Sequence, residues 1–157
     1  MIVKRLGPVA WDLSYDAMRA FTAARDERTA DEVWLCEHPP VFTQGIAGRA
    51  EHVHDVGAVP VVRTDRGGQV TYHGPGQVVA YPLVDLRRLG IYVKEYVFRL
   101  EQSLLKTLET YGITGHRVAG EPALTRILSG FFKVSAATTL IGMRDVLASA
   151  FCLTVGS

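Results

Sequence analysis

The spacing of apolar residues along the chain predicts two helices. Residues 12–26 carry apolar side chains at three- and four-residue steps among several alanines, a pattern typical of an amphipathic helix. Asp12 and Ser14 are both good candidates for its N-cap. Residues 93–112 repeat valine, leucine and tyrosine at the same steps, and Gly112 stands where a C-cap belongs.

Short apolar runs between these helices predict strands. Each run is rich in β-branched or aromatic residues and is bounded by glycine, proline or charged residues. The predicted strands are 3–6, ended by Gly7 and Pro8, then 31–38, which should be largely buried, 41–45, 59–65, 69–74 and 75–86. After Gly120 the pattern predicts a strand, a turn, a second strand and a short helix near residues 143–151.

Composition places the chain among soluble intracellular proteins. With 157 residues, 48% of them hydrophobic and 21% charged, it suits one globular domain. The formal net charge of +1 means that the chain lacks the excess of positive charge that binding to nucleic acid requires. Cys36 and Cys152 are far apart and suggest a reducing compartment rather than a disulfide scaffold. The sequence shows no signal-length or membrane-spanning apolar run, so we expect a cytoplasmic protein without a membrane partner.

Residues 65–77, DRGGQVTYHGPGQ, combine four glycines with several hydrogen-bonding side chains. The segment lacks the phosphate-loop pattern and leads into a strand rather than a helix, which argues against a nucleotide cradle. Two interpretations remain open: tight turns in a hairpin, or a slot where missing side chains admit a ligand. His38, His52 and His54 fit hydrogen-bonded or solvated loop residues better than metal ligands, so no metal is expected.

A longer stretch, RGGQVTYHGPGQVVAYPLVDL, resembles the signature of the octanoyl-[acyl-carrier-protein]:protein octanoyltransferases, the lipoate-protein ligase B family of lipoate biosynthesis. The upstream segment DEVWLCEHPPVFTQGIAGRAEH and the later GHRVAGEP also occur in family order. The similarity covers about residues 1–122.

The resemblance implies an α/β (α+β) fold in which a mixed β-sheet packs with helices, like the biotin and lipoate protein ligases. It further implies one catalytic domain, 1–157, diverged over about 123–157 and shortened at its C-terminus. Glycines would leave room for an alkyl chain, and polar side chains would surround its reactive end. The residues that would line this acyl-substrate site are Arg66, Gly67, Gly68, Gln69, Val70, Thr71, Tyr72 and His73.

Family members use a lysine and a cysteine for catalysis, and neither motif is intact here. In TRILSGFFKVSAATTLIG, Arg126 occupies the place of the family lysine, and Lys133 is the other basic candidate. Cys152 is the only distal cysteine, but the family's flanking proline and glycine are missing. Cys152, Lys133 and Arg126 are therefore the catalytic candidates. Cys152 also fits a small buried residue, and Cys36, inside an apolar run, fits the core.

The resemblance implies transfer of an octanoyl group from acyl carrier protein, through a cysteine thioester, to a lysine of a lipoyl domain, without a cofactor. The acceptors would be lipoyl domains of 2-oxoacid dehydrogenases and the glycine cleavage H protein. Arginines Arg63, Arg66, Arg87 and Arg88 could form a basic rim for the acidic carrier. Two alternatives remain: a non-catalytic module that binds acyl carrier or lipoyl domains, and a ligase that activates free lipoate with ATP.

Overall fold

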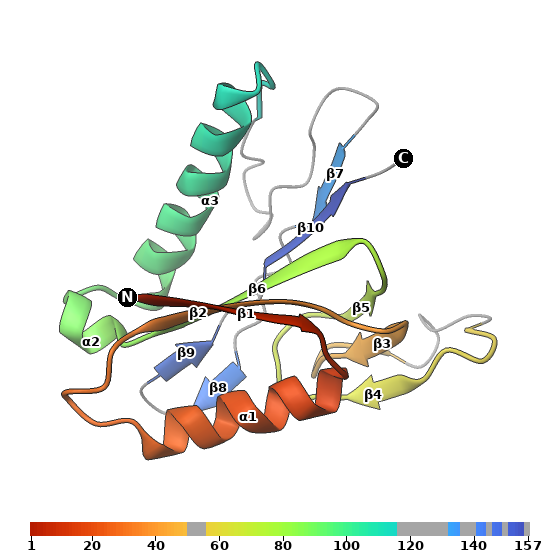
Figure 1. Cartoon of the computed structure of the whole chain (residues 1–157), viewed down its shortest axis with the longest axis horizontal. Coiled ribbons are helices and arrows are strands. Elements are labelled where there is room, and N and C mark those ends of the chain that lie inside the picture. Colours follow the sequence, from red (N-terminus) through yellow and green to blue (C-terminus); the bar gives the residue numbers. More distant parts are fainter. Residues whose placement is uncertain (50–55, 116–131, 136–140, 144–145, 149–150, 156–157) are drawn as a thin grey trace.

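The computed structural model describes residues 1–49, 56–115, 132–135, 141–143, 146–148 and 151–155, with side chains described up to residue 115. Within these residues a main mixed sheet, a smaller sheet and helices pack together (Figure 1). The predicted α/β class, a mixed sheet packed with helices, is confirmed.

The main sheet is organised around its longest strand, β6. Its principal strands are, in order, β1 (Ile2–Pro8), β2 (Glu32–Glu37), β6 (Gln77–Val84), β10 (Phe151–Val155) and β7 (Phe132–Ser135), while β9 (Val146–Ala148) pairs with β6 and β8 (Ile141–Met143) pairs with β9. The β1–β2 pair is parallel, and the other pairs are antiparallel. The strand β6 therefore has neighbours along both edges.

A smaller sheet lies at one end of the main sheet. It consists of β4 (Val61–Arg63), β3 (Val41–Gln44) and β5 (Val70–His73), in that order (Figure 1). The chain passes from β2 to β3 through residues 38–40 and returns from β5 to β6 through residues 74–76. These two short connections bring the ends of β5 and β2 to the start of β6.

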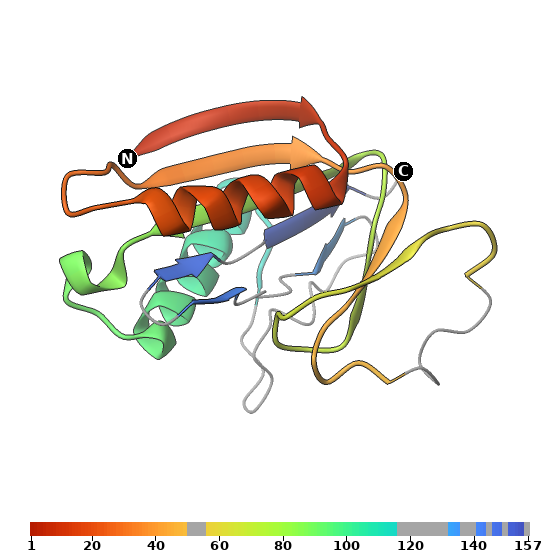
Figure 2. The same cartoon turned by 90° about the horizontal axis from the view of Figure 1, so that it is seen from below.

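Helices cover both faces of the main sheet (Figure 2). The helix α1 (Trp11–Ala24) places Met18 in a core made with Trp34, Cys36, Val79, Tyr81 and Leu83. On the other face, α3 (Val93–Thr110) packs Leu100, Leu104 and Leu105 near Ala80. The short helix α2 (Leu86–Leu89) connects β6 to α3. In the described part of the chain, no helix is long and apolar enough to cross a membrane.

The two predicted helices are confirmed, with one correction to α1. Its N-cap is Ala10, without a side-chain cap, so the prediction of Asp12 or Ser14 as N-cap is wrong. The hydroxyl of Ser14 is buried and donates to the carbonyl of Trp11 at 2.7 Å. Trp11 is also buried and stacks on Tyr15, with 4.8 Å between ring centroids, so packing decides where the helix begins.

Gly112 ends α3 as predicted. Its φ of +70° is the left-handed conformation that glycine adopts most readily. The N–H of Gly112 donates to Glu109 and that of Ile113 to Leu108, both at 3.0 Å, which is the Schellman arrangement.

The predicted strands 31–38, 41–45, 59–65, 69–74 and 75–86 are confirmed as β2 to β6. The prediction that Gly7 and Pro8 end the first strand is wrong. A register shift between Arg5 and Gly7, with Gly7 at φ +66°, lets the chain keep pairing with β2 as far as Pro8 and Glu37. A bulge of this kind absorbs the glycine without ending the ladder.

The short helix predicted near residues 143–151 is also wrong. The described residues of that stretch lie in strands β8, β9 and β10. Ala148 pairs with Leu83 and Leu147 with Val84 on β6. Backbone pairing with a buried neighbouring strand here outweighs local helix propensity, which is a weak determinant.

A buried arginine fixes the end of α1 against the sheet. The carboxylate Oδ1 of Asp31 lies 2.6 Å from Nη2 of Arg25 and 3.0 Å from Nη2 of Arg88. It also accepts the N–H of Asp85 at 3.0 Å. The Arg25 side chain is only 4% exposed. One carboxylate thus connects α1, the loop before β2 and the end of β6, and it neutralises a buried charge.

We expect Asp31→Ala to lower the free energy of unfolding by about 3 kcal/mol or more, because it leaves the buried Arg25 guanidinium without a counter-charge. Glu95→Ala is the control: it breaks the exposed pair between Glu95 and Arg99 and should cost about 0.5 kcal/mol or less. Urea unfolding followed by circular dichroism measures both. Equal effects of the two substitutions would contradict the role given to Asp31.

Candidate functional site

A buried polar cluster lies between the two sheets. Arg66 and His73 come from the glycine-rich segment, and both are nearly inaccessible to solvent, at 4% and 6% exposed. The main sheet contributes Gln77 and Tyr81, and His38 follows β2 directly; all three are buried. Polar residues of this kind are seldom buried unless they bond to one another or to a ligand.

His73 is held in its neutral form. Its Nδ1–H donates to Oε1 of Gln77 at 2.9 Å, so Nε2 carries the lone pair. The pKa of His73 is lowered from 6.5 to about 4, chiefly by burial and to a smaller extent by the electrostatic influence of His38 and Arg66. At neutral pH the imidazole is therefore an uncharged hydrogen-bonding group.

A second histidine adjoins the first. The Nδ1–H of His38 donates to the carbonyl of Val9 at 2.8 Å, and Nε2 accepts from the hydroxyl of Tyr81 at 2.9 Å. The rings of His38 and His73 meet edge to face, with 5.6 Å between centroids. Burial lowers the pKa of His38 as well. Two neutral imidazoles thus lie side by side where β2, β5 and β6 meet.

Arg66 is a buried cation whose hydrogen bonds all go to neutral oxygens. It donates from Nη2 to the carbonyl and the hydroxyl of Thr43 and from Nη1 to the carbonyl of Gly67. Among the described residues no carboxylate pairs with it, and its buried Nε has no hydrogen-bond partner. Burial lowers the pKa of Arg66, yet a guanidinium does not lose its proton in proteins. The site therefore contains an uncompensated positive charge.

The glycines serve the backbone of this segment. A Cβ on Gly45 would come within 2.4 Å of the carbonyl oxygen of Gly68, so only glycine allows this approach. The N–H groups of residues 45–47 donate to carbonyls of residues 66–69 at 2.9 to 3.2 Å. Gly68 and Gly76 have φ of +83° and +79° and form turns, and a Cβ on Gly67 or on Gly76 would meet no neighbour within 4 Å. Turn formation therefore accounts for Gly68 and Gly76, whereas Gly67 is exposed on the surface.

The structure separates the eight predicted lining residues into two groups. Arg66 and His73 are buried together in the cluster. Because side chains alternate along β5, Tyr72 lies on the opposite face from His73, 46% exposed and 5.1 Å from Phe42 between ring centroids. Gly67, Gly68 and Gln69 are exposed, while Val70 and Thr71 are partly buried.

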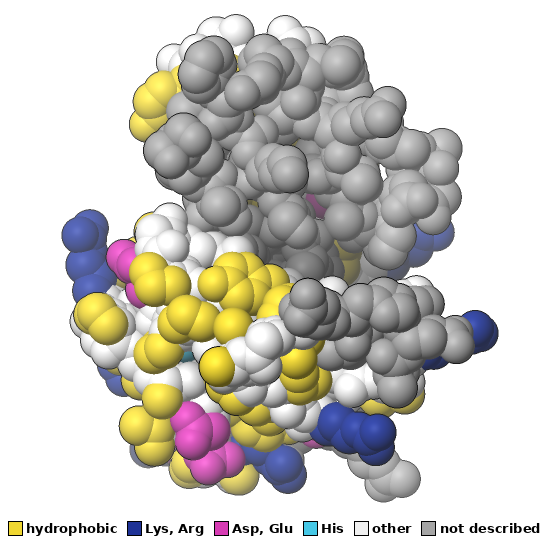
Figure 3. Space-filling view, turned by 90° about the vertical axis from the view of Figure 1, so that its right-hand side faces the viewer, with side chains coloured by type: hydrophobic (Ala, Val, Ile, Leu, Met, Phe, Trp, Pro, Cys, Tyr) yellow, Lys and Arg dark blue, Asp and Glu magenta, His cyan; other side chains and the backbone are white. Residues whose placement is uncertain are grey.

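Tyr72 belongs to an apolar row on the outer face of the small sheet. Phe42 pairs with Val61 on one side and with Tyr72 on the other, and Val61 and Tyr72 are both exposed. The space-filling view from the side of this sheet shows hydrophobic side chains gathered there (Figure 3).

The strand register places Cys152 on the strand next to β6 and Lys133 one strand further away. Cys152 on β10 pairs with Val79, the residue that also pairs with Cys36 on β2. Lys133 on β7 pairs with Thr154, which pairs with Gln77. Two strand spacings separate the Cα atoms of the cysteines by roughly 10 Å, too far for a disulfide. Arg126 lies outside the described residues.

Cys36 is a core residue, as predicted. It is 3% exposed and packs with Trp34, Val79 and Tyr81. Burial raises the pKa of its thiol to about 12, with a further contribution from Glu37. A thiol with so high a pKa supplies almost no thiolate at neutral pH and is a poor nucleophile.

Sequence reasoning missed His38, Gln77 and Tyr81 as members of the cluster. The sequence did carry a pattern that indicates His38: Trp34, Cys36 and His38 are alternate residues, and all three are buried. His38 is hydrogen-bonded as expected, but it is not solvated; His52 and His54 lie outside the described residues. In the described chain no group of three or more His, Cys, Asp or Glu residues could hold a metal ion.

The basic rim expected from four arginines does not form. Arg66 is buried, and Arg87 and Arg88 lie on α2, at the opposite end of the molecule from Arg63 on β4 (Figure 1). Arg88 pairs with Asp31, 3.0 Å away. The expectation was wrong because linear spacing does not reveal that α2 and β4 are at opposite ends of the fold.

Sequence relatives of the chain are octanoyltransferases. It is 69% identical over 121 residues to the octanoyltransferase of Methylibium petroleiphilum, an alignment covering 77% of this chain and 54% of that protein. It is 62% identical over 120 residues to the octanoyltransferase of Albidiferax ferrireducens, covering 76% and 52%. The chain thus spans about half the length of the curated relatives it matches.

Solved structures show the same fold at low sequence identity. A lipoate-protein ligase A bound with ATP superposes with a TM-score of 0.68 at 13% identity, covering 98% of this chain and 65% of that one. A putative lipoate protein ligase from T. acidophilum gives a TM-score of 0.69 at 12% identity, covering 100% and 70%. These likenesses confirm the predicted ligase-like fold.

The model of the lipoyl protein ligase A/B catalytic domain matches residues 10–156. With the octanoyltransferase relatives, this match means that the chain belongs to the lipoyl protein ligase A/B family, in its octanoyltransferase group.

Proposed function

We propose that this chain transfers an octanoyl group from acyl carrier protein to a lysine of lipoyl domains, through a cysteine thioester, in the cytoplasm. The acceptors are lipoyl domains of 2-oxoacid dehydrogenases and the glycine cleavage H protein. The octanoyltransferase names of the relatives support this assignment. A solved structure with the same fold is that of a bi-partite lipoate protein ligase and its E2 lipoyl domain from Thermoplasma acidophilum.

The observation that carries the proposal is the uncompensated charge of Arg66. Burying a guanidinium without a carboxylate partner lowers the stability of the fold. Among the described residues the Nε–H of Arg66 has no acceptor, and it can donate to an oxygen of a bound ligand. When a nucleophile attacks a thioester, negative charge develops on the carbonyl oxygen of that thioester. A fixed, buried cation stabilises such an oxyanion far more than water does. Arg66 therefore suits an acyl-transfer site.

We assign His73 a positioning role for the same reaction. An imidazole with a pKa of about 4 is too weak a base to take a proton efficiently from a thiol whose pKa is about 8.5. Its neutral form does not repel the Arg66 cation, and its Nε2 can accept a hydrogen bond. His73 and Gln77 thus hold the polar end of the substrate, and the exposed backbone at Gly67 is the place for its alkyl chain.

We propose Cys152 as the nucleophile, because Cys36 supplies almost no thiolate. The Cys152 thiolate attacks the octanoyl carbonyl and a new C–S bond forms. The C–S bond to the pantetheine sulfur breaks, and the pantetheine thiolate leaves and takes up the proton that Cys152 lost. The lysine amine of the lipoyl domain then attacks the new thioester, forming the amide and releasing Cys152. Lys133, whose strand pairs with β10, is the candidate for the charge that stabilises the thiolate, and Arg126 is the other cation considered.

A second candidate function is a binding module without catalysis. One observation favours it: Cys152 lies inside β10, paired with Val79 on one side and Ser135 on the other. Interior strand positions of this kind more often carry structural residues than nucleophiles, which tend to lie on loops. Such a module would bind acyl carrier protein but would not accept the octanoyl group.

Incubation with octanoyl-acyl carrier protein followed by intact-mass measurement tests the transfer. We expect the chain to gain one octanoyl group that hydroxylamine removes, because a thioester is labile to this reagent. Cys152→Ala should abolish the gain, and Cys36→Ala, the matched control, should retain it. An octanoyl gain that survives Cys152→Ala would contradict the assignment of the nucleophile. Binding of the carrier without any gain would establish the module instead.

Stability should fall as the pH drops from 6.5 toward 4. The unfolded chain binds a proton on His73 near pH 6.5, but the folded chain binds it only near a pKa of about 4. The stabilisation is therefore complete above pH 6.5 and is lost through this window, by about 3 kcal/mol. Urea unfolding at a series of pH values measures it. His73→Asn, which keeps a donor toward Gln77, should flatten the curve there; an unchanged curve would rule out the buried neutral imidazole.

A further inference from the structure

A hydrogen bond from α1 reaches the residue that precedes Arg66. The hydroxyl of Tyr15 donates to Oδ1 of Asp65 at 2.5 Å, across 50 residues of sequence. Asp65 is exposed, whereas Arg66 is only 4% exposed. Two adjacent side chains of opposite charge therefore point in different directions, Asp65 to the outside of the protein and Arg66 to the inside. Tyr15 holds the carboxylate that is nearest to Arg66 in the sequence.

The ring of Tyr15 is fixed on one face of α1. Trp11, Tyr15 and Arg19 follow one another at four-residue steps, which places them on the same face of the helix. The rings of Trp11 and Tyr15 stack with 4.8 Å between centroids, and the guanidinium of Arg19 lies 5.7 Å from the centroid of the Tyr15 ring. Partial burial and then Asp65 raise the pKa of Tyr15, and they outweigh the opposite effect of Arg19. The hydroxyl therefore keeps its proton at neutral pH and remains a donor to Asp65.

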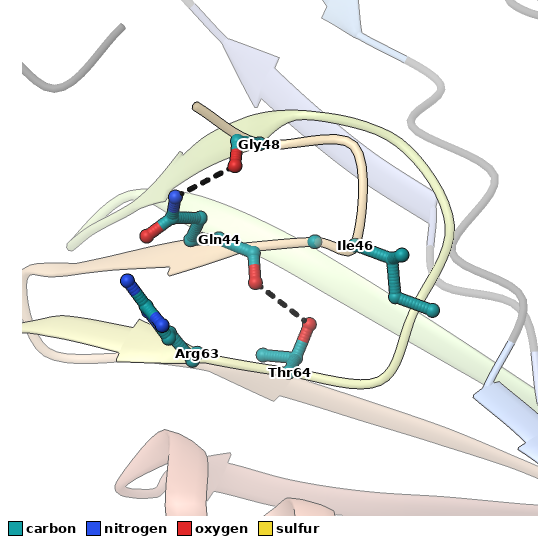
Figure 4. A pocket seen from close by; sticks show the side chains of 6 residues that line it. Gln44, Ile46, Gly48, Arg63 and Thr64 are labelled. Carbon is teal, nitrogen blue, oxygen red and sulfur yellow. Dashed lines mark hydrogen bonds between the residues drawn. The ribbon is translucent and has the colours of Figure 1, made fainter. Parts of the chain in front are cut away.

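The backbone on both sides of Asp65 is also fixed. The N–H and the hydroxyl of Thr64 both donate to the carbonyl of Gln44, at 2.9 and 3.3 Å, and Figure 4 shows the bond from the hydroxyl. The carbonyl of Arg66 accepts the N–H of Ile46 at 2.9 Å. Because both neighbours are held, the freedom left to Asp65 is the direction of its side chain. The hydrogen bond from α1 determines that direction.

The direction of the Asp65 side chain matters because of the charge on Arg66. Adjacent Cα atoms are about 3.8 Å apart, and charges in a protein interior are screened far less than in water. Among the described residues no carboxylate pairs with Arg66, and Asp65 bonds to Tyr15 instead. An Asp65 carboxylate that turned inward would neutralise Arg66 and would compete with a substrate oxygen for it.

We propose that Tyr15 is a positioning residue, which keeps the Asp65 carboxylate away from Arg66 so that the positive charge stays available to the substrate. The inference rests on the proposed function, in which Arg66 stabilises the oxyanion. It adds a contact from α1, outside the glycine-rich segment, on which the charge of the site depends. Tyr15 acts through Asp65 and does not contact the substrate.

Calorimetric titration of the whole chain with octanoate and with octanamide tests this role. The two probes share their alkyl chain, but only octanoate brings a negative charge to Arg66. We expect Tyr15→Phe to weaken octanoate binding about tenfold, because the released carboxylate competes for the cation, and to change octanamide binding less than about twofold. Phenylalanine keeps an aromatic ring to stack on Trp11, so α1 should be retained.

Combining Tyr15→Phe with Asp65→Asn separates positioning from a structural role. Asparagine removes the carboxylate charge, so octanoate affinity should return to within about twofold of that of the unsubstituted chain. A structural role of Tyr15 predicts a different result: both probes would bind more weakly, and Asp65→Asn would restore neither. Tyr92→Phe is the matched control, because Tyr92 is 87% exposed at the start of α3. It should leave both affinities unchanged.

Several results would overturn the proposal. Tyr15→Phe would then weaken both probes equally or leave octanoate affinity unchanged, or Asp65→Asn would fail to restore that affinity. Absence of octanoate binding to the unsubstituted chain would have the same meaning, because Arg66 would then take up no anion. Loss of the folded circular dichroism spectrum in Tyr15→Phe would also overturn the proposal, since the role of Tyr15 would be structural.

Failure of this inference is distinguishable from failure of the proposed function. If Tyr15→Phe selectively weakens octanoate binding and Asp65→Asn restores it, but no octanoyl group is gained from acyl carrier protein, the transfer fails and the positioning role stands. If the octanoyl group is gained and Tyr15→Phe changes neither the rate of that gain nor the octanoate affinity, the transfer stands and the positioning role is wrong.

Discussion

A buried positive charge for which the described residues offer no carboxylate partner is the constraint on which the site depends. Taking a guanidinium out of water costs several kcal/mol even after the protein relaxes. Within the described part of the chain, the neutral oxygens of Thr43 and Gly67 are the groups that offset that cost. A fold that keeps Arg66 buried accepts lower stability than an apolar side chain would give. The lower stability is explained if the carbonyl oxygen of the substrate becomes negatively charged during the reaction and Arg66 stabilises that charge.

The surrounding structure is arranged to keep this charge in place and to avoid competing with it. The carbonyls of the Arg66 segment are tied to residues 45–47, and Gly45 permits that contact because it has no side chain. The two neighbouring histidines stay neutral because burial lowers the pKa of both, and this outweighs their hydrogen bonds to Val9 and Gln77, which raise it. The short connection through residues 74–76, from β5 to β6, then places His73 against Gln77. The fold thus positions the cluster at the junction of two sheets rather than on a loop alone.

Local pattern was enough to predict the main elements but not the site. The period of the apolar residues identified α1 and α3, and the positive φ of Gly112 followed from its place at the end of a helix. Contacts between distant segments could not be read in this way. Arg66 is an example, since arginine is usually exposed and its burial depends on Thr43, 23 residues away.

Side chains alternate between the two faces of a strand. This alternation alone predicts that Tyr72 and His73 lie on opposite faces, and that His38 lies on the buried face with Trp34 and Cys36. The helix expected near residues 143–151 failed for the opposite reason. Its residues are able to form a helix, but pairing with β6 decides their conformation. Local propensity therefore described the parts of the chain whose partners are close in sequence, and tertiary pairing decided the others.

The most direct test of the central claim observes Arg66 itself. In a ¹⁵N–¹H spectrum the Nε–H signal of Arg66 can be assigned by its loss in Arg66→Lys. We expect this signal to move downfield when an unreactive amide analogue of octanoyl-pantetheine is added, because the Nε–H of Arg66 then donates to the analogue's carbonyl. An Nε–H signal that stays in place while the analogue binds would contradict the account.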